Sequence, residues 1–311
     1  MLRQIIVIFA WLSLLYLPPA VAENAVRGAN AEPAQQVNIG GKHGALFMIR
    51  HEDHTLYLFG TIHVGKEDFF PFEPIVSRAL AHASKVALEI DPADVQSAQQ
   101  AVLKYAMYPP GSALSLTPEL RAQVAAQLKK YGIPYEVIAQ MKPWMVAVLL
   151  TLGEFTMHGY QPEYAVDMFI SRSAHLRQQP VIALETIDDQ LGLFDKLTDA
   201  EQIEFLEHTV NDLRNPASAK KAILIAQLWR NADARGLDAL AAELEKDTRS
   251  SAKFMKQVLL DGRNVSLADS IAALLKQEKN GFAAVGILHL VGANGIPAIL
   301  QRQGYLVERV Y

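Results

Sequence analysis

Four short apolar runs in this chain each end in a histidine or a glutamate, and this pattern constrains the fold more than any other feature. The runs are Thr55–Gly65, Lys85–Asp91, Pro180–Thr186 and Gly281–Gly292. The polar residues that they deliver are His63, Glu89, Glu185 and His289. Short apolar runs are typical of buried strands, and strands that alternate with helices form mostly parallel sheets. Since ligands bind at the carboxyl edge of such sheets, the four side chains are predicted to meet there.

Two of these runs carry the same four-residue signature, Gly60-Thr-Ile-His63 and Gly286-Ile-Leu-His289. A glycine at such a position allows the backbone to approach a ligand closely or to adopt a positive φ. A single histidine after a strand is usually a hydrogen-bonded structural residue, so neither signature is specific alone. Four polar strand ends in one chain favour a shared polar site over four separate structural roles.

The order of the elements predicts an α/β fold, with a mostly parallel central sheet and large helical insertions that cover the carboxyl edge of the strands. A hairpin is expected over residues 45–59, because two apolar runs flank a polar turn. Helical patterns cover residues 93–178 and 188–278, and residues 305–310 are typical of a closing strand. We therefore predict a single domain over residues 44–311.

The first 22 residues have the pattern of a secretory signal peptide. Arg3 precedes an apolar run, Ile5–Leu17, and Ala20-Val21-Ala22 forms a small-residue cleavage site. The apolar run is short for a membrane-spanning helix, so an uncleaved anchor is the less favoured alternative. Residues 23–43 show little periodicity and are predicted to form a flexible leader. No later stretch is apolar enough to span a bilayer, and we expect an exported protein, periplasmic or secreted, without a membrane partner after signal cleavage.

The charge and the cysteine content exclude several functional classes. The chain has 29 Lys and Arg residues against 33 Asp and Glu residues and no basic run, which argues against a nucleic-acid partner. It contains no cysteine, so disulfides, zinc–thiolate sites and a thiol nucleophile are excluded. No serine lies in a nucleophile elbow, and neither a His-Glu-x-x-His motif nor a phosphate-binding glycine loop is present. What remains is the chemistry of histidine and carboxylate side chains.

Imidazole and carboxylate groups together are ligands for first-row metals such as Zn, Mn, Co and Fe. The predicted metal ligands are His63, His289, Glu89 and Glu185. A divalent ion held by them would acidify a bound water and polarise a carbonyl, as in metal-assisted hydrolysis. One glutamate would act as a ligand and the other as the general base, and the sequence does not distinguish between them. Without a metal ion, the same side chains could form a His/Glu acid–base pair.

Arg263 and Asn264 are a further pair of candidates for the site. In one interpretation Asn264 caps the helix that follows, since asparagine is a favoured N-cap residue. In the other, Arg263 reaches the site and offers a fork to a carboxylate or an oxyanion. With the second interpretation, the predicted catalytic residues are Glu89, Glu185, Arg263 and Asn264.

Several short motifs follow one another in a characteristic order. They are Tyr57–His63, Val86–Asp91, Lys142–Trp144, Val166-Asp167, Ala183–Thr186 with Gln190, Arg263-Asn264 and Ala284–Gly292. This order resembles that of the TraB/GumN family, which also contains the TIKI membrane-anchored metalloproteases. The resemblance extends over about residues 44–310, nearly the whole predicted mature chain. Each motif is weak alone, and the ordered set is fairly specific.

The resemblance implies an α/β fold related to the erythromycin-esterase and ChaN-like haem-binding proteins. In the TIKI branch it implies metal-dependent proteolysis, with manganese or cobalt as the usual activating ions. Carried across by motif, the site residues are the paired histidines, their acidic partners and the family's Arg-Asn pair: His63, His289, Glu89, Glu185, Arg263 and Asn264. No C-terminal membrane anchor is expected, which departs from the TIKI pattern.

The leading functional hypothesis is an exported metal-dependent hydrolase, a peptidase that uses a divalent ion (Mn, Co or Zn). Its partner would be a peptide or small-molecule substrate. The alternative is a non-catalytic periplasmic protein that binds or sequesters a peptide, a signal molecule or haem. A third hypothesis, an accessory factor in envelope polysaccharide production, rests only on the GumN name. The sequence predicts neither the identity of the substrate nor the oligomeric state.

Overall fold

The computed structural model describes residues 41–311 of the chain. The predicted signal peptide, residues 1–22, and most of the predicted leader lie outside the described residues. None of the helices within residues 41–311 is long and apolar enough to cross a membrane.

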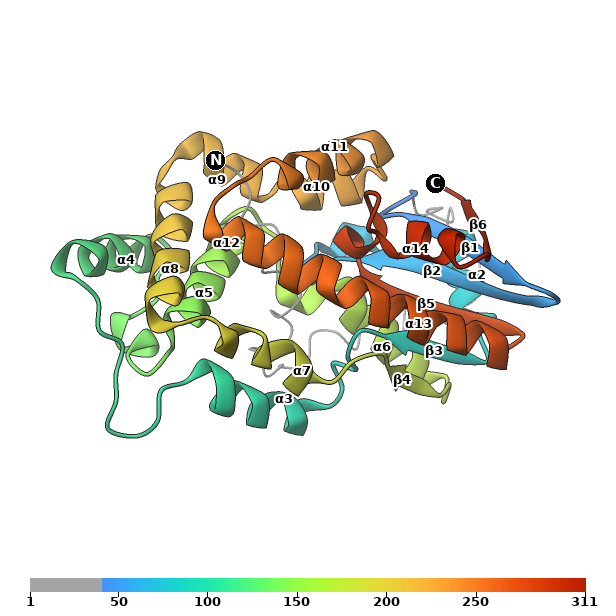
Figure 1. The fold of residues 1–311 in the computed structure, drawn as a ribbon, viewed down its shortest axis with the longest axis horizontal. Helices are drawn as coiled ribbons and strands as arrows, with labels where there is room; N and C mark the ends of the chain where they lie inside the picture. Colours follow the sequence, from blue (N-terminus) through green and yellow to red (C-terminus); the bar gives the residue numbers. More distant parts are fainter. Residues whose placement is uncertain (1–40) are drawn as a thin grey trace, which may run out of the picture.

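A six-stranded sheet organises one half of the molecule (Figure 1). Its strand order is β4-β3-β5-β2-β1-β6. The strands are β1 (Leu46–His51), β2 (His54–Thr61), β3 (Lys85–Leu88), β4 (Val181–Ala183), β5 (Asn280–Gly286) and β6 (Leu306–Arg309). Neighbouring strands from β4 to β2 are parallel, whereas β1 pairs antiparallel with both β2 and β6. The predicted α/β class with a mostly parallel sheet is confirmed.

The middle of the sheet consists of strands that are buried on both faces. Residues 86–88 of β3 and 282–285 of β5 are at most 2% exposed. Such continuous apolar runs are typical of parallel strands that helices cover on both sides. At the carboxyl end of the β2–β5 ladder, Thr61 pairs with Gly286. The two Gly-x-x-His segments therefore leave the sheet side by side.

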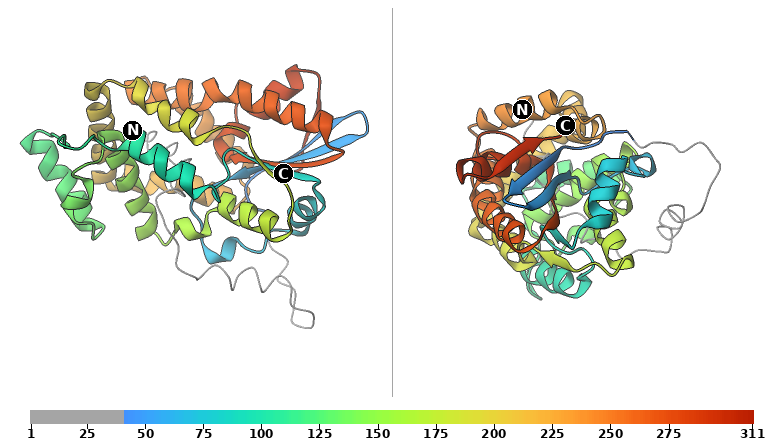
Figure 2. Two further views of the ribbon diagram at one scale, coloured as in Figure 1. Left: turned by 90° about the horizontal axis from the view of Figure 1, so that it is seen from below. Right: turned by 90° about the vertical axis from the view of Figure 1, so that its right-hand side faces the viewer.

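Helices cover both faces of the sheet and give a three-layer arrangement (Figure 2). On one face, α13 (Gly262–Gln277) contacts β1, β2 and β5. On the other face, α2 (Pro74–His82) contacts β5, and α6 (Val166–Leu176) contacts β3 and β4. The helix α14 (Ile296–Arg302) packs against α13 and leads into the edge strand β6.

A larger helical region lies beyond the carboxyl ends of the parallel strands (Figure 1). Most of it comes from the segments between β3 and β4 and between β4 and β5, as predicted. Its elements before β4 are α3 (Val95–Ala101), η4 (Val102–Ala106), α4 (Pro118–Lys130), η5 (Tyr135–Ile138), α5 (Pro143–Met157) and η6 (Pro162–Tyr164). Those after β4 are α7 (Ile187–Gly192), η7 (Phe194–Lys196), α8 (Asp199–Arg214), α9 (Pro216–Ala222), α10 (Leu224–Arg230), α11 (Ala234–Glu245), α12 (Ser250–Lys253) and η8 (Phe254–Asp261). Two further short helices are η3 (Glu67–Phe69) and η9 (Ile287–Leu290).

Local sequence signals fix where several of these helices begin. At the start of α8, Thr198 and Glu201 form the capping box that their spacing predicts. The Glu201 carboxylate accepts the Thr198 backbone N–H at 2.8 Å, and the Thr198 hydroxyl accepts the Glu201 backbone N–H at 3.3 Å. Similarly, Thr117 caps α4, and Pro118 occupies the first helical position, where a missing N–H is harmless.

Candidate functional site

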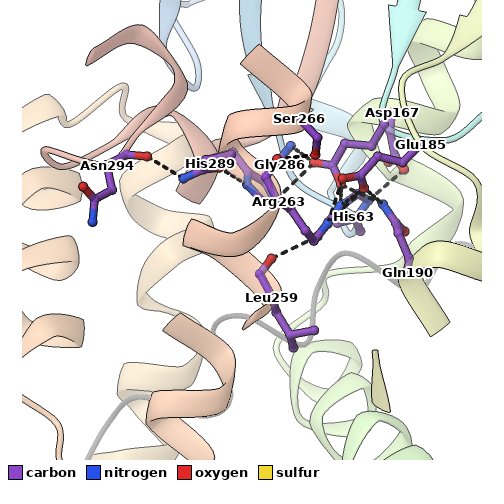
Figure 3. Close-up of polar contacts among 12 residues, drawn as sticks. His63, Asp167, Glu185, Gln190, Leu259, Arg263, Ser266, Gly286, His289 and Asn294 are labelled. Carbon is purple, nitrogen blue, oxygen red and sulfur yellow. Dashed lines mark hydrogen bonds and ion pairs between the residues drawn. The ribbon is translucent and has the colours of Figure 1, made fainter. Parts of the chain in front are cut away.

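The four polar residues delivered by the apolar runs lie together at the carboxyl edge of the sheet. Three of them, His63, Glu185 and His289, are labelled in Figure 3. They follow β2, β3, β4 and β5 in turn: His63, Glu89, Glu185 and, within η9, His289. Because these four strands are neighbours in the sheet, their ends converge. All four side chains are at most 10% exposed.

Gly286 lies where three of these side chains meet. A Cβ atom at this residue would be 3.1 Å from Glu89 Oε1, 3.6 Å from His289 Cδ2 and 3.9 Å from His63 Nε2. The backbone N–H of Gly286 also donates to Glu89 Oε1. A larger residue would press on the carboxylate and fill the space that it shares with the two imidazoles.

Arg263 bridges the two glutamates. Its Nη2 atom donates to Glu89 Oε2 at 2.9 Å and to Glu185 Oε2 at 2.6 Å, and its Nε atom donates to Glu185 Oε2 at 2.9 Å. Gln190 of α7 donates to the same Glu185 oxygen at 2.9 Å. Arg263 Nη1 donates to the backbone carbonyl of Leu259, four residues earlier, at 3.1 Å. The guanidinium therefore lies inside the site, between two carboxylates (Figure 3).

Asp167, in the first turn of α6, holds the imidazole of His63. Asp167 Oδ2 lies 2.7 Å from His63 Nδ1. The two segments meet because the Val166 backbone N–H donates to the Ile62 carbonyl at 2.9 Å. In the neutral imidazole, Nδ1 carries the proton that it donates to this carboxylate, and Nε2 keeps its lone pair. His63 Nε2 is buried and has no hydrogen-bond partner within residues 41–311.

Asn264 holds His289 in a similar way. Asn264 Oδ1 lies 2.6 Å from His289 Nδ1, and Asn264 Nδ2 donates to the Asn294 backbone carbonyl at 2.7 Å. A carbonyl oxygen only accepts, so the amide nitrogen faces Asn294 and the amide oxygen faces the imidazole. Neutral His289 therefore carries its proton on Nδ1, and its Nε2 atom lies 3.8 Å from Glu89 Oε1. Since α13 begins at Gly262, Asn264 lies inside the helix, and the interpretation of Asn264 as its N-cap is wrong.

The two imidazoles differ in acidity because their partners differ. Burial lowers the pKa of His63, but the charge and hydrogen bond of Asp167 outweigh it, so this pKa is raised above its ordinary value. Burial lowers the pKa of His289 to about 4, and the Arg263 charge acts in the same direction. Burial would raise the pKa of Glu89, but His289, which is protonated at the acid pH where Glu89 titrates, and Arg263 lower it to about 2. The site thus combines an ionised glutamate, a neutral His289 and a His63 that readily accepts a proton.

The side chains of the site include a donor set that suits a transition metal. No group of three or more His, Asp or Glu side chains within residues 41–311 is arranged to hold a metal ion as it stands. His289 Nε2 nevertheless lies 3.8 Å from Glu89 Oε1, and His63 Nε2 borders the same space beside Gly286. Imidazole with carboxylate suits Zn, Mn and Co. Each imidazole also binds a second residue through Nδ1, as metal-ligating histidines do. The types of donor atom present therefore suit a divalent ion.

The comparison with known proteins identifies the family of the chain. The sequence profile of the TraB/PrgY/gumN family matches residues 45–309. The chain belongs to this family. It is similar to "Uncharacterized protein YbaP" from Escherichia coli (strain K12), at 24% identity over 247 residues that cover 79% of this chain and 87% of that protein. The protein with the same name from Shigella flexneri is similar to the same extent. No solved structure matches the chain.

The family match contains the whole site, including residues to which the sequence assigned no role. Asp167 and Gln190 stood within motifs of the resemblance, and Asn294 was not considered. A signal for Asp167 exists in hindsight, because an acidic residue in the first turn of an otherwise buried helix needs a partner. Asn294 contributes its backbone carbonyl. Since every residue has such a group, the residue type at this position gives no signal. The catalytic and metal-binding roles of the site residues stay predictions.

Proposed function

We propose that this member of the TraB/PrgY/gumN family is an exported metal-dependent hydrolase that acts on peptides. The observation that carries the proposal is that Glu89 Oε1 and the imidazole rings of His63 and His289 border the same space beside Gly286, with each Nδ1 atom tied to Asp167 or Asn264. When both imidazoles are neutral, their Nε2 lone pairs and the Glu89 carboxylate repel one another, and a cation between them would turn this repulsion into attraction.

The charge of the site supports a divalent cation. The cluster contains the carboxylates of Glu89, Glu185 and Asp167, the guanidinium of Arg263 and two imidazoles. When both imidazoles are neutral, the net charge of the cluster is −2. Such an excess is unfavourable in a buried site, and a divalent ion would remove it. A protonated His63, which Asp167 favours, supplies part of this compensation in the metal-free protein. Binding of the ion is therefore expected to release a proton.

Within this proposal, the two histidines and Glu89 hold the ion, and the remaining side chains position them. A bound ion of this kind acidifies water and polarises a peptide carbonyl. Arg263 and Gln190 fix Glu185 next to Glu89. Within residues 41–311, Glu185 Oε1 accepts one long bond, from Arg263 Nε at 3.3 Å. We assign this oxygen as the base that takes the proton of the attacking water.

The choice of a peptide substrate rests on the resemblance to the TIKI metalloproteases. Arg263 is not required to contact the substrate, because its guanidinium already binds both glutamates and the Leu259 carbonyl. Its role in the proposal is to hold the carboxylates of Glu89 and Glu185 close together. A small-molecule amide or ester is the other substrate class that this chemistry serves.

Metal uptake is the first test. The purified full-length protein is stripped with a chelator, dialysed against Mn, Co or Zn, and analysed for bound metal. We expect stoichiometric retention by the wild-type protein and loss of retention in His63→Ala and His289→Ala. His82→Ala removes an exposed histidine at the end of α2 and is the matched control. No uptake by the wild type, or equal uptake by both site variants, rejects the metal site.

Turnover is the second test. The metal-loaded protein is incubated with a peptide library, and products are identified by mass spectrometry. Glu185→Gln removes the proposed base, so it should retain the ion and lose about 100- to 10,000-fold in rate. Retention of the ion without any product from the wild type rejects the hydrolase and favours a periplasmic binding protein.

We also propose that residues 1–22 direct export, because they combine Arg3, an apolar run and a small-residue cleavage site. Cell fractionation followed by mass spectrometry of the intact chain tests this. We expect a periplasmic or secreted protein whose first residue is Glu23. A cytoplasmic protein that keeps residues 1–22 would contradict the proposal.

A further inference from the structure

A cavity of about 220 Å³ lies outside the polar site, between η7, α8, α12 and η8. Its apolar part is formed by Leu197, Phe205, Phe254 and Val258, and the rest of its lining is polar: Lys196, Glu201, Ser250 and Ser251. Lys196 and Ser250 at its rim are exposed, whereas Phe205 and Phe254 are buried, so the cavity extends from the surface into the core. Native cores contain few voids larger than a water molecule. A cavity of this size is large enough to admit a small ligand.

The volume and the walls of the cavity suit a single apolar ring. An engineered cavity of about 150 Å³ with apolar walls is known to bind benzene. Two of the wall residues already belong to an aromatic cluster. Phe205 and Phe254 each make an edge contact with Phe194, at ring-centroid distances of 6.5 and 5.5 Å. A further ring would extend this cluster with contacts of the same kind.

One wall of the cavity belongs to the helix that also carries Arg263. Phe254 and Val258 lie in η8, which is a π-helical run of eight residues. π-Helical segments are rare, usually a single turn long, and frequent at functional sites. η8 continues directly into α13, and the Leu259 carbonyl accepts the bond from Arg263 Nη1 (Figure 3). Val258 in the cavity wall is thus the neighbour of a residue that holds the site arginine.

We propose that this cavity is a binding site for an apolar ring, and that the bound ring stabilises η8 and thereby the position of Arg263. The ring belongs either to a small aromatic molecule or to the aromatic side chain of a peptide, and both present the same surface to the cavity. The proposal does not depend on the hydrolase, because the cavity and η8 exist whether or not the polar site holds a metal ion.

Binding of fluorobenzene to the full-length protein, followed by ¹⁹F NMR, tests the site. We expect a saturable change in the wild-type protein. Val258→Phe places a ring in the cavity and should weaken binding about tenfold or more, which equals about 1.4 kcal/mol. Val265→Phe adds the same ring at a 55% exposed position on α13 and should bind as the wild type does. If Val258→Phe does not fold, Ser250→Phe at the rim replaces it.

Either of two results overturns the site: no saturable binding to the wild type, or binding of equal strength in the blocking variant. Hydrogen exchange of residues 254–263 tests the link to Arg263. Fluorobenzene should slow exchange there in the wild type and in Val265→Phe, but not in Val258→Phe. Binding without slower exchange overturns the link. A parallel titration with N-acetyl-4-fluorophenylalanine amide distinguishes the two possible sources of the ring. Tighter binding than that of fluorobenzene identifies the side chain of a peptide, and weaker binding identifies a small molecule.

Discussion

Two glutamates of this protein, Glu73 and Glu89, are equally buried and differ greatly in acidity. Each is 5% exposed. Burial raises the pKa of Glu73 to about 7. Burial would also raise the pKa of Glu89, but the positive charges of His289 and Arg263 lower it to about 2. The comparison shows that the partners of a buried carboxyl group, and not its depth, decide whether it is charged.

The partners of the two groups differ in a simple way. Glu89 lies in the site, where Arg263 and the backbone N–H of Gly286 donate to it. Glu73 occupies the N-cap position of α2 but makes no side-chain capping bond. Neither of its carboxyl oxygens accepts a well-formed hydrogen bond within residues 41–311, and the nearby backbone N–H groups of Glu73 and His43 lower its pKa by less than burial raises it. Glu89 therefore keeps its negative charge where the proposed ion binds, whereas burial favours the protonated, neutral form of Glu73.

Removal of Arg263 should make Glu89 resemble Glu73, and we expect the largest effect from this change. Arg263→Ala leaves two buried carboxylates without their shared guanidinium, and loss of one partner of a buried ion pair costs about 3–5 kcal/mol. The free energy of unfolding at neutral pH, measured with urea, should fall by this amount. Arg302→Ala, an exposed position at the end of α14, is the control and should change it little. A loss no larger than that of the control would show that the ion pairs contribute nothing.

Glu73→Gln should stabilise the protein at about pH 8 and leave its stability nearly unchanged at about pH 4. The folded protein binds the Glu73 proton more tightly than the unfolded chain does. The resulting stabilisation is fully present below 4.5, the ordinary pKa of a glutamate, and is lost as the pH rises through about 7. This difference corresponds to at most about 3 kcal/mol. Glutamine keeps the size of the side chain and removes the titration, so urea unfolding of both proteins at the two pH values measures the effect.

The control for this prediction is Glu67→Gln, which removes an exposed carboxylate of η3. Its effect on the free energy of unfolding should stay within about 0.5 kcal/mol at either pH. If Glu73→Gln were no more stabilising than this control at about pH 8, the Glu73 carboxylate would have to be ionised and hydrated in the folded protein. The contrast with Glu89 would then disappear.

The sequence predicts the position of Glu89 but not its partners. Continuous apolar runs identify β3 and β5 as buried parallel strands, and a residue directly after such a strand lies at the carboxyl edge. The same reasoning places His63 and His289 near each other. Arg263 lies far along the chain in a helix, and a cap at Asn264 was an equally physical interpretation of that segment. Only the packing of α13 against the sheet decides between them.

Asp167 and Glu73 show why the rest of the site and its surroundings could not be predicted. Asp167 reaches His63 because Val166 pairs with Ile62, a contact between the first residue of α6 and the segment after β2 that no periodic pattern predicts. Glu73 is buried by the tertiary packing around the start of α2, where its position in the sequence predicts an exposed helix start. Both features depend on long-range contacts, which a local pattern does not contain.

The pair of His63 and Asp167 extends the comparison to a third buried carboxyl group. Asp167→Asn keeps a hydrogen-bond acceptor for Nδ1 but removes the charge, so this imidazole should come to resemble His289 and its pKa should fall. Loss of such a partner typically weakens metal binding about 10- to 100-fold. Isothermal titration with Mn or Zn measures this effect. Asp238→Asn, at an exposed position, is the control. Unchanged affinity would show that Asp167 does not support a ligand.

The smallest expected effect comes from Gly286, whose backbone N–H is one of the partners that Glu73 lacks. The backbone of Gly286 has φ −51° and ψ 136°, which alanine adopts without strain. In Gly286→Ala, however, the new Cβ atom would lie 3.1 Å from Glu89 Oε1, so the carboxylate must shift by a few tenths of an ångström. Mild overpacking of this kind costs about 1 kcal/mol.

The matched control is Gly192→Ala in α7, where the new Cβ atom would meet Tyr105 at an ordinary distance of 3.6 Å. Alanine favours the helix over glycine, so this variant should be stabilised by about 0.5 kcal/mol or more. The two substitutions add the same methyl group and are expected to have opposite signs in urea unfolding. If Gly286→Ala were also stabilising, the Glu89 carboxylate would not be held tightly against the backbone N–H of residue 286. The low pKa of Glu89 would then have to come from Arg263 and the histidines alone.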